Sequence, residues 1–328
     1  MRAAYVEQLG PVENIRFGDL PVPRPGPADV LVEVTATTVN WVDTFVRSGV
    51  FQTQVDLPFV VGRDLVGTVV GTGARVHGFA AGETVWCNSL GHDGRQGAAA
   101  ERVVVPADRL YHLPPGASPT DAVAVAHPAA TAYLGLFTHG QVRAGETVVV
   151  AGAAGNVGSA LVTLAVDAGA RVVAVARDTE YCTALGATEV IDYRDPERWQ
   201  RIRAVCPQGI DTYVDTSGEN DLTNAVDLLA LRGRIVLLAG VRTRPVLPAG
   251  QLYMKDGSVV GFVISHATVA ELAEAAETIN RLLADGRLRP RATTTMPLSA
   301  TADAHRMLEQ GQLHGKRVIL EAAQSGDT

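Results

Sequence analysis

The sequence is poor in cysteine and has no excess of positive charge. Its 328 residues include only three cysteines, Cys87, Cys182 and Cys206, too few and too scattered for the disulfide framework of a small secreted protein. We therefore expect a reducing compartment, the cytoplasm. The formal net charge is −7, which argues against the basic face that a general nucleic-acid partner needs.

Long apolar runs and the motifs of several enzyme classes are also missing. No window approaches the roughly 18 uninterrupted apolar residues of a membrane span, and the first residues lack the apolar stretch of a signal peptide, so no membrane partner is expected. The Y-x-x-x-K pair of short-chain reductases, the G-x-S-x-G elbow of hydrolases and the Walker G-K-S/T motif do not occur. The sequence thus offers no residues for those three chemistries.

The pattern of apolar residues changes along the chain and divides it into segments. Up to residue 120, short β-branched segments between Gly/Pro turns predict a β domain that is barrel-like or partly open. Residues 121–265 alternate apolar runs with helical stretches, the pattern of a doubly wound parallel sheet. Residues 266–328 begin with an amphipathic helix and end in the strand-like GKRVILEA. That last strand has no partner left unless it returns to the first domain.

A glycine-rich turn stands at the centre of VVVAGAAGNVGSALVTLAVDAGA. A glycine at 155 lets backbone N–H groups approach a pyrophosphate at the positive end of a helix dipole, and a glycine at 158 lets the helix pack closely on the strand. Because strand, turn, helix and second strand follow in this order, the stretch predicts a dinucleotide site. Its expected cofactor-binding residues are Gly152, Ala153, Gly155, Asn156, Val157 and Gly158.

The next apolar run ends in a cation, Arg177, at the position that reads the cofactor's ribose. An acid there would bind the ribose 2′-hydroxyl and repel a 2′-phosphate, whereas an arginine attracts that phosphate. Arg177 therefore favours NADPH over NADH, with Tyr193 able to reach the same phosphate. The neighbouring acid, Asp178, keeps a solvent-exposed arginine open as the alternative.

In order and spacing these motifs resemble the medium-chain dehydrogenase/reductase superfamily, specifically its zinc-free quinone oxidoreductase (zeta-crystallin-like) branch. The resemblance runs nearly end to end through NWVDTFVRSGVF, LPFVVGRDLVGTVVGTG, GAAAERVVVP, TAYLGL, AGAAGNVG, LGATEVIDYR, GRIVLLAG and GKRVIL. It implies a GroES-like β domain built from both chain ends, an inserted Rossmann domain that binds NADP, and an active site in the cleft between them. It also implies a homodimer or homotetramer.

The resemblance further allows the zinc ligands of the alcohol dehydrogenase relatives to be sought. Where those relatives carry Gly-His-Glu this chain has Gly62-Arg63-Asp64, and their cysteine ligand falls in the Asn40–Asp43 segment. A permanent cation then stands in place of a ligand, so no zinc is expected. Without zinc, the expected hydride acceptor is already electrophilic, a quinone or an α,β-unsaturated carbonyl compound.

By the same resemblance the substrate pocket uses Asn40, to hold the acceptor carbonyl, and Thr131, beside the nicotinamide. Arg63 either stabilises the reduced oxygen or pairs with Asp64 or Asp43. Phe45 departs from the family's usual tyrosine, which puts benzoquinone itself in doubt as the natural acceptor. The later strand ends add the expected cofactor contacts Ser217, Leu238, Gly240, Phe262, Val263 and Ile264.

Three functions stay open at this point. The first is an NADPH-dependent, zinc-independent reductase of small-molecule quinones or enones. The second is an enoyl-thioester reductase, whose carrier would need a basic rim to which Arg24, Arg47 and Arg63 could contribute. The third is a non-catalytic, crystallin-like protein that binds NADPH without turnover.

Overall fold

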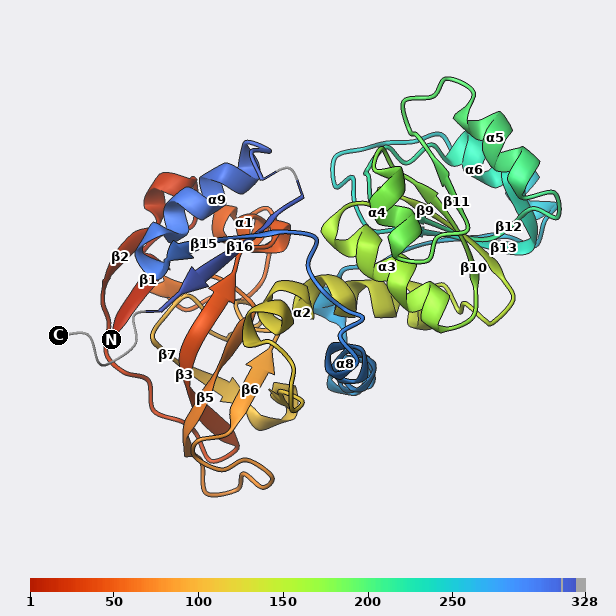
Figure 1. Ribbon diagram of the computed structural model, residues 1–328. Helices are drawn as coiled ribbons and strands as arrows, with labels where there is room; N and C mark the ends of the chain where they lie inside the picture. Colours follow the sequence, from red (N-terminus) through yellow and green to blue (C-terminus); the bar gives the residue numbers. More distant parts are fainter. Residues whose placement is uncertain (314, 323–328) are drawn as a thin grey trace. The chain divides into compact units, whose positions relative to one another are not determined.

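The computed structural model describes residues 1–313 and 315–322, and it divides into two compact units (Figure 1). Unit 1 comprises Met1–His127 and Leu272–Thr328, and unit 2 comprises Pro128–Glu271. The boundaries expected from the sequence, after residues 120 and 265, lie a few residues before those of the structure, which fall after residues 127 and 271. Within the described residues, none of the helices is both long enough and apolar enough to cross a membrane.

Unit 1 contains a large, mostly antiparallel sheet. In spatial order its strands are β15 (Thr293–Pro297), β16 (Arg317–Glu321), β3 (Asp29–Thr38), β5 (Leu65–Thr72), β6 (Thr84–Cys87) and β8 (Tyr111–His112), with β7 (Arg102–Pro106) paired to β3. The early half of β3 pairs with β7, and its late half pairs antiparallel with β16. The C-terminal strand therefore returns to the first domain.

A smaller sheet and several helices complete unit 1. The small sheet has the order β2 (Arg16–Asp19), β1 (Arg2–Val6) and β4 (Phe59–Val60), and the helices are α1 (Trp41–Ser48), the N-terminal part of α2 (Pro119–Tyr133), most of α8 (Val269–Ala284) and α9 (Thr301–Glu309). Buried residues of α8 recur at helical spacing, Leu272, Ala275, Ala276, Ile279, Leu282 and Leu283. That periodicity marks the face that packs on the unit.

Unit 2 is the predicted doubly wound parallel sheet. Its strands in spatial order are β11 (Glu189–Ile191), β10 (Arg171–Val175), β9 (Thr147–Ala151), β12 (Ile210–Asp215), β13 (Leu229–Leu237) and β14 (Ser258–Gly261). Every pair in this sheet is parallel. The chain order reverses direction at β9 and β12, and in such sheets ligands bind at the strand ends beside that point.

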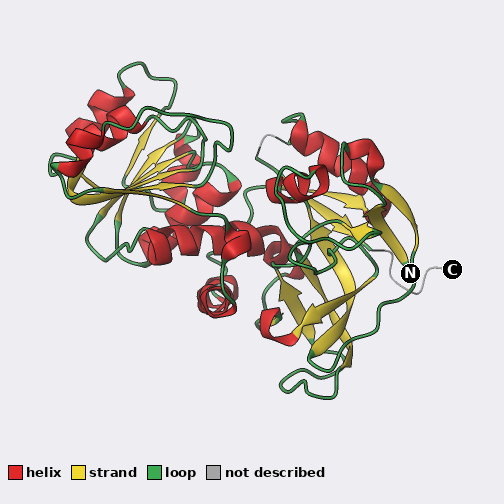
Figure 2. Cartoon of the chain, turned by 180° about the vertical axis from the view of Figure 1, so that it is seen from behind, coloured by secondary structure: helices red, strands yellow, loops and turns green. Residues whose placement is uncertain are grey.

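Helices cover both faces of this sheet (Figures 1 and 2). They are α3 (Asn156–Asp167), α4 (Thr179–Ala184), α5 (Arg198–Val205) and α6 (Leu222–Leu228), with the short α7 (Ala249–Tyr253) before β14. The side chains of Ile202 on α5 and Val226 on α6 share one core with Val149 and Val173 of the sheet. The packing of these helices on the sheet holds the strands in place, and the predicted cofactor residues lie at the ends of those strands.

Candidate active site

The glycine turn of unit 2 has the geometry that a dinucleotide phosphate needs. Gly152 follows β9 with a φ of 79°, and Gly155 precedes the first turn of α3 without a side-chain cap. A Cβ atom at Gly158 would lie 2.1 Å from the Gly152 carbonyl oxygen, and one at Gly152 would lie 2.4 Å from Thr216 Oγ1. Side chains are thus excluded at Gly152 and Gly158, and the first N–H groups of α3 stay available to an anion. The residues present fit a pyrophosphate.

Arg177 and Tyr193 lie beyond two neighbouring strand ends. Strands β10 and β11 pair with Val175 opposite Ile191, and the two predicted phosphate-binding residues follow these positions, both exposed. The Asp178 carboxylate accepts a hydrogen bond of 3.0 Å from the Tyr181 backbone N–H and so caps α4. That acid therefore has a structural task of its own at the start of α4.

The later strand ends are organised by an acid that the sequence reasoning missed. Asp215, fully buried at the end of β12, accepts hydrogen bonds from the Ser217 N–H and hydroxyl at 2.7 Å each and from the Asn220 N–H at 2.9 Å. In the sequence, Asp215 is recognisable only as an acid at the end of an apolar run. The predicted residue Ser217 is therefore occupied in holding this loop.

The other predicted residues of unit 2 differ in their packing. Leu238 and Phe262 both approach Gly135, and Phe262 stacks on His139 with ring centroids 4.3 Å apart. Val263 is 40% exposed and Ile264 is buried. Ala153 is buried in the turn, Asn156 and Val157 form the first turn of α3, Gly240 follows β13 with a φ of 93°, and Thr131 lies on α2 in unit 2.

In unit 1 the predicted pocket residues meet in a buried polar cluster. The Asp43 carboxylate accepts a 2.7 Å hydrogen bond from the Asn40 backbone N–H and so holds the first turn of α1. The Asn40 side-chain nitrogen donates to Asp64 Oδ2 at 2.8 Å, and the Thr38 hydroxyl donates to the same oxygen at 2.9 Å. The amide nitrogen of Asn40 is thereby committed to a carboxylate. Holding an acceptor carbonyl, the expected role of Asn40, would need that same nitrogen.

Two arginines enter this cluster from opposite ends of the chain. Arg63 Nε lies 3.7 Å from Asp43 Oδ1, so the expected ion pair with Asp43 is present without a hydrogen bond. Arg317 of β16 donates to the Ala124 carbonyl at 2.8 Å and lies 3.7 Å from Asp64 Oδ2. Sequence reasoning missed Arg317, whose signal was a charge at the first position of the strand, directly before the apolar run Val318–Leu320.

Burial governs the protonation of the cluster. It raises the pKa of Asp43 to about 6 and that of Asp64 to about 7, although nearby arginine charges oppose the shift. Burial also lowers the pKa of Arg63 to about 10. Burial and the charges of Arg63 and Arg317 lower the pKa of His127, which is therefore neutral at pH 7. The site holds fixed cations and carboxyl groups that titrate near neutrality.

Phe45 lies outside the hydrogen bonds of this cluster, on α1. Its ring is 6.3 Å from that of Trp41, and Trp41 is 51% exposed. The two aromatic rings give the surface of α1 an apolar character next to Asn40.

The donor set of the cluster does not fit a zinc ion. In residues 1–313 and 315–322, three or more His, Cys, Asp or Glu side chains nowhere gather in a way that could hold a metal. The position that resembles the zinc-ligand histidine holds Arg63, whose guanidinium nitrogens donate rather than ligate.

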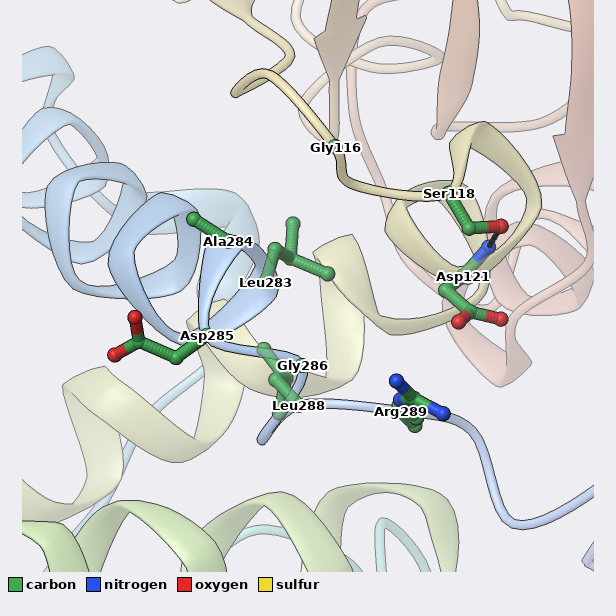
Figure 3. A pocket seen from close by; sticks show the side chains of 9 residues that line it. All are labelled: Gly116, Ser118, Asp121, Leu283, Ala284, Asp285, Gly286, Leu288 and Arg289. Carbon is green, nitrogen blue, oxygen red and sulfur yellow. Dashed lines mark hydrogen bonds between the residues drawn. The ribbon is translucent and has the colours of Figure 1, made fainter.

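One pocket of unit 1 stands apart from these residues (Figure 3). It has a volume of about 260 Å³, and its lining is Gly116, Ser118, Asp121, Leu283, Ala284, Asp285, Gly286, Leu288 and Arg289. None of the predicted site residues contributes to it.

Comparison with known proteins agrees with this architecture. Residues 26–115 match the family model "Alcohol dehydrogenase GroES-like domain", and residues 156–281 match "Zinc-binding dehydrogenase". The mouse quinone oxidoreductase is 30% identical over 328 residues, 98% of each chain.

Solved structures of similar proteins cover almost the whole chain. A structure titled as an NAD-dependent alcohol dehydrogenase is 31% identical with a TM-score of 0.87 and covers 98% of this chain and 100% of its own. A mycobacterial protein solved with NADPH is 26% identical with a TM-score of 0.82, covering 98% and 99%. With a relative 30% identical across its length and both domain models in place, the chain belongs to the medium-chain dehydrogenase/reductase superfamily, in its quinone oxidoreductase branch.

Proposed function

We propose that this oxidoreductase transfers a hydride from NADPH to a quinone or an α,β-unsaturated carbonyl compound, without zinc. The observation that carries the proposal is the glycine turn of unit 2, because Gly152 and Gly158 leave no room for a side chain and the N-terminus of α3 is without a side-chain cap, open to a pyrophosphate. Arg177, exposed beyond β10, supplies the cation that a 2′-phosphate needs. The NADPH bound to the mycobacterial relative supports the same choice of cofactor.

The acceptor class follows from the charges in unit 1. Bound NADPH supplies the hydride. The chain supplies Arg63 where a metal-dependent relative would need a ligand, and Arg317 adds a second cation to the cluster, so the acceptor must be electrophilic without a Lewis acid. The polar cluster of Asn40, Asp43 and Asp64 orients what binds there. Quinones and enones meet this requirement. The oxidation of ordinary alcohols is disfavoured, because it needs a Lewis acid that polarises the alcohol.

The thioester alternative receives less support. Of the three arginines considered for a basic rim, Arg47 is buried and bound to Glu309 and Arg63 is also buried, which leaves Arg24 exposed. A single exposed arginine is a poor docking surface for an anionic acyl carrier. The crystallin-like alternative, in which the protein binds NADPH without turnover, is distinguished only by measuring turnover.

The test is the oxidation of NADPH and of NADH at 340 nm with 9,10-phenanthrenequinone, with and without a chelator. We expect turnover that prefers NADPH and is unchanged by chelation. Arg177→Gln should raise the KM for NADPH about tenfold, the loss of one charged hydrogen bond, and leave the KM for NADH unchanged. Arg171→Gln, at the other end of β10, is the matched control. Equal effects on both cofactors, or turnover that the chelator abolishes, would contradict the proposal.

We also propose that the protein forms a homodimer in the cytoplasm. Strand β14 ends the sheet of unit 2, and close to it Leu231, Tyr253 and Met254 are at least 70% exposed. A hydrogen bond of 2.6 Å from the Arg232 N–H to the Lys255 carbonyl brings these side chains to one place. All three cysteines are buried and free, which agrees with a reducing compartment.

A further inference from the structure

The guanidinium of Arg63 presents a complete donor edge that no acceptor meets. Arg63 is 1% exposed, and its Nε and Nη2 atoms are buried without a hydrogen bond to any residue that the structure describes. The N–H bonds of these two atoms are parallel, and this edge is the one with which arginine grips a carboxylate by two hydrogen bonds. A buried charged donor that makes no hydrogen bond lowers the stability of the folded protein. The edge therefore calls for an acceptor.

The two carboxylates of the cluster do not supply that acceptor. Asp43 Oδ2 accepts from the Asn40 backbone N–H, and Asp43 Oδ1 stays 3.7 Å from Arg63 Nε, too far for a hydrogen bond. Asp64 Oδ2 accepts from the Asn40 side chain and from the Thr38 hydroxyl. The other two oxygens, Asp43 Oδ1 and Asp64 Oδ1, are buried without a hydrogen bond, and neither lies within hydrogen-bond distance of Arg63. Arg63 therefore keeps its free edge although the pairs balance in formal charge.

We propose that Arg63 binds a carboxylate of the hydride acceptor, so that the substrate is an enone acid rather than a neutral quinone. The position that holds a cation in zinc-dependent relatives is, in this chain, a site for an anion. This inference rests on the proposed reductase function and names its substrate class. The carboxylate meets Nε and Nη2 together. The unsaturated carbonyl part of the same molecule receives a hydride from NADPH at its β-carbon and a proton from water at its α-carbon, which gives the saturated keto acid and NADP⁺.

The cluster can take up a proton when the anion arrives. With both arginines and both aspartates ionised, Arg63, Arg317, Asp43 and Asp64 are neutral as a group, and a further anion would leave one buried negative charge. Burial raises the pKa of Asp43 to about 6 and that of Asp64 to about 7, so either can bind a proton near neutral pH. The remaining titratable groups whose charges act on these residues are His127, Arg95 and Cys87. We therefore expect one proton to bind with each anion, and anion affinity to fall as the pH rises.

The first experiment uses the wild-type enzyme and two matched acceptors, trans-4-oxo-2-pentenoate and its methyl ester. The ester is the more electrophilic of the two, so the chemistry alone favours the ester. We expect kcat/KM for the acid to exceed that for the ester by about ten- to a hundredfold, the range of one charged hydrogen-bonded pair. Equal rates, or a preference for the ester, would overturn the anion site and leave the proposed reductase function standing.

Variants then assign the preference to Arg63. Arg63→Gln should lower kcat/KM for the acid more than that for the ester, through a raised KM for the acid, so that the preference for the acid is lost. Arg102→Gln is the matched control, since Arg102 lies on β7 of the same unit, is 42% exposed and pairs with Glu33. A variant at 63 that keeps the acid preference would contradict the assignment. If that variant fails to fold, the wild-type comparison still decides the proposal.

The third measurement does not depend on turnover. Levulinate, a saturated analogue of the enone acid, should raise the thermal midpoint of the protein in a chloride-free zwitterionic buffer. Its dissociation constant should increase with pH, by up to about tenfold per unit above pH 7, as the accompanying proton becomes harder to bind. A protein that reduces no acceptor but binds levulinate in this way would refute the reductase function and retain the anion site. Absence of any levulinate effect would overturn the site.

Discussion

At the scale of single residues, Gly158 shows how little room the cofactor turn has. The residue lies in the first turn of α3, where its own backbone is helical and any residue could be accommodated by conformation alone. The limit comes from the neighbouring turn, because a Cβ atom would stand 2.1 Å from the Gly152 carbonyl and 2.8 Å from Ala153 Cα. Both contacts are with backbone atoms, which cannot rotate away.

Gly158→Ala should therefore push α3 away from the turn and displace the N–H groups that meet the pyrophosphate. We expect a loss of stability of about 1–3 kcal/mol, the usual effect of overpacking, together with a KM for NADPH raised about tenfold. The matched control is Gly250→Ala in α7, where nothing lies within 4 Å of the added atom. Denaturant midpoints and NADPH titration check both variants. Unchanged NADPH binding in the Gly158 variant would contradict the pyrophosphate assignment.

The strand–turn–helix around the three glycines could be predicted from the sequence because its contacts are local. Gly152, Gly155 and Gly158 act within one strand–turn–helix segment, so their spacing alone carries the signal. The unit 1 cluster depends on long-range partners instead. Asn40 meets Asp64 across 24 residues and Thr38 meets Arg317 across 279, and no periodicity in the sequence reports such pairs.

At the scale of elements, strand β16 joins several parts of unit 1 through one side chain. Arg317 donates to the Ala124 carbonyl of α2, to the Val39 carbonyl that follows β3, and to the Thr38 hydroxyl of β3 itself. The segment GKRVILEA is expected to form a strand, and its return to the first domain follows from the lack of a partner in the parallel sheet. The sharing of one edge of β3 between β7 and β16 could not be predicted, because it depends on where β3 bends between its two partners.

Arg317→Met should destabilise unit 1 by about 3–5 kcal/mol, because it leaves Asp64 buried without its counter-charge. Replacing that carboxylate as well, in Arg317→Met with Asp64→Asn, should recover part of the loss. Arg306→Met on α9 is the control, since its ion pairs are exposed and contribute at most about 1 kcal/mol. Urea midpoints compare the three proteins. A single variant as stable as the wild type would show that the Asp64–Arg317 pair does not hold the strand.

At the scale of the whole molecule, the proposed dimer follows from the open edge of the parallel sheet. An unpaired edge strand beside exposed apolar side chains is a ready surface for a second chain. Light scattering should give twice the mass of one chain for the wild type. Met254→Lys should shift the mass toward one chain, and Val22→Lys, also at an exposed apolar residue but in unit 1, should leave it unchanged. A wild-type mass equal to one chain would refute the dimer.

The placement of unit 2 between the two segments of unit 1 also sets an order of events during synthesis. Domains fold as the ribosome releases them, and Pro128–Glu271 is complete before Leu272 leaves the tunnel. Unit 2 can therefore fold first. The part of β3 that pairs with β16 stays unpaired until β16 has been synthesised. Until Arg317 emerges, Asp64 lacks its ion pair with the last strand, so the polar centre of unit 1 cannot be complete before that strand is synthesised. Nascent chains halted just before residue 317 should expose that edge to chaperones, although their cofactor-binding half is already formed.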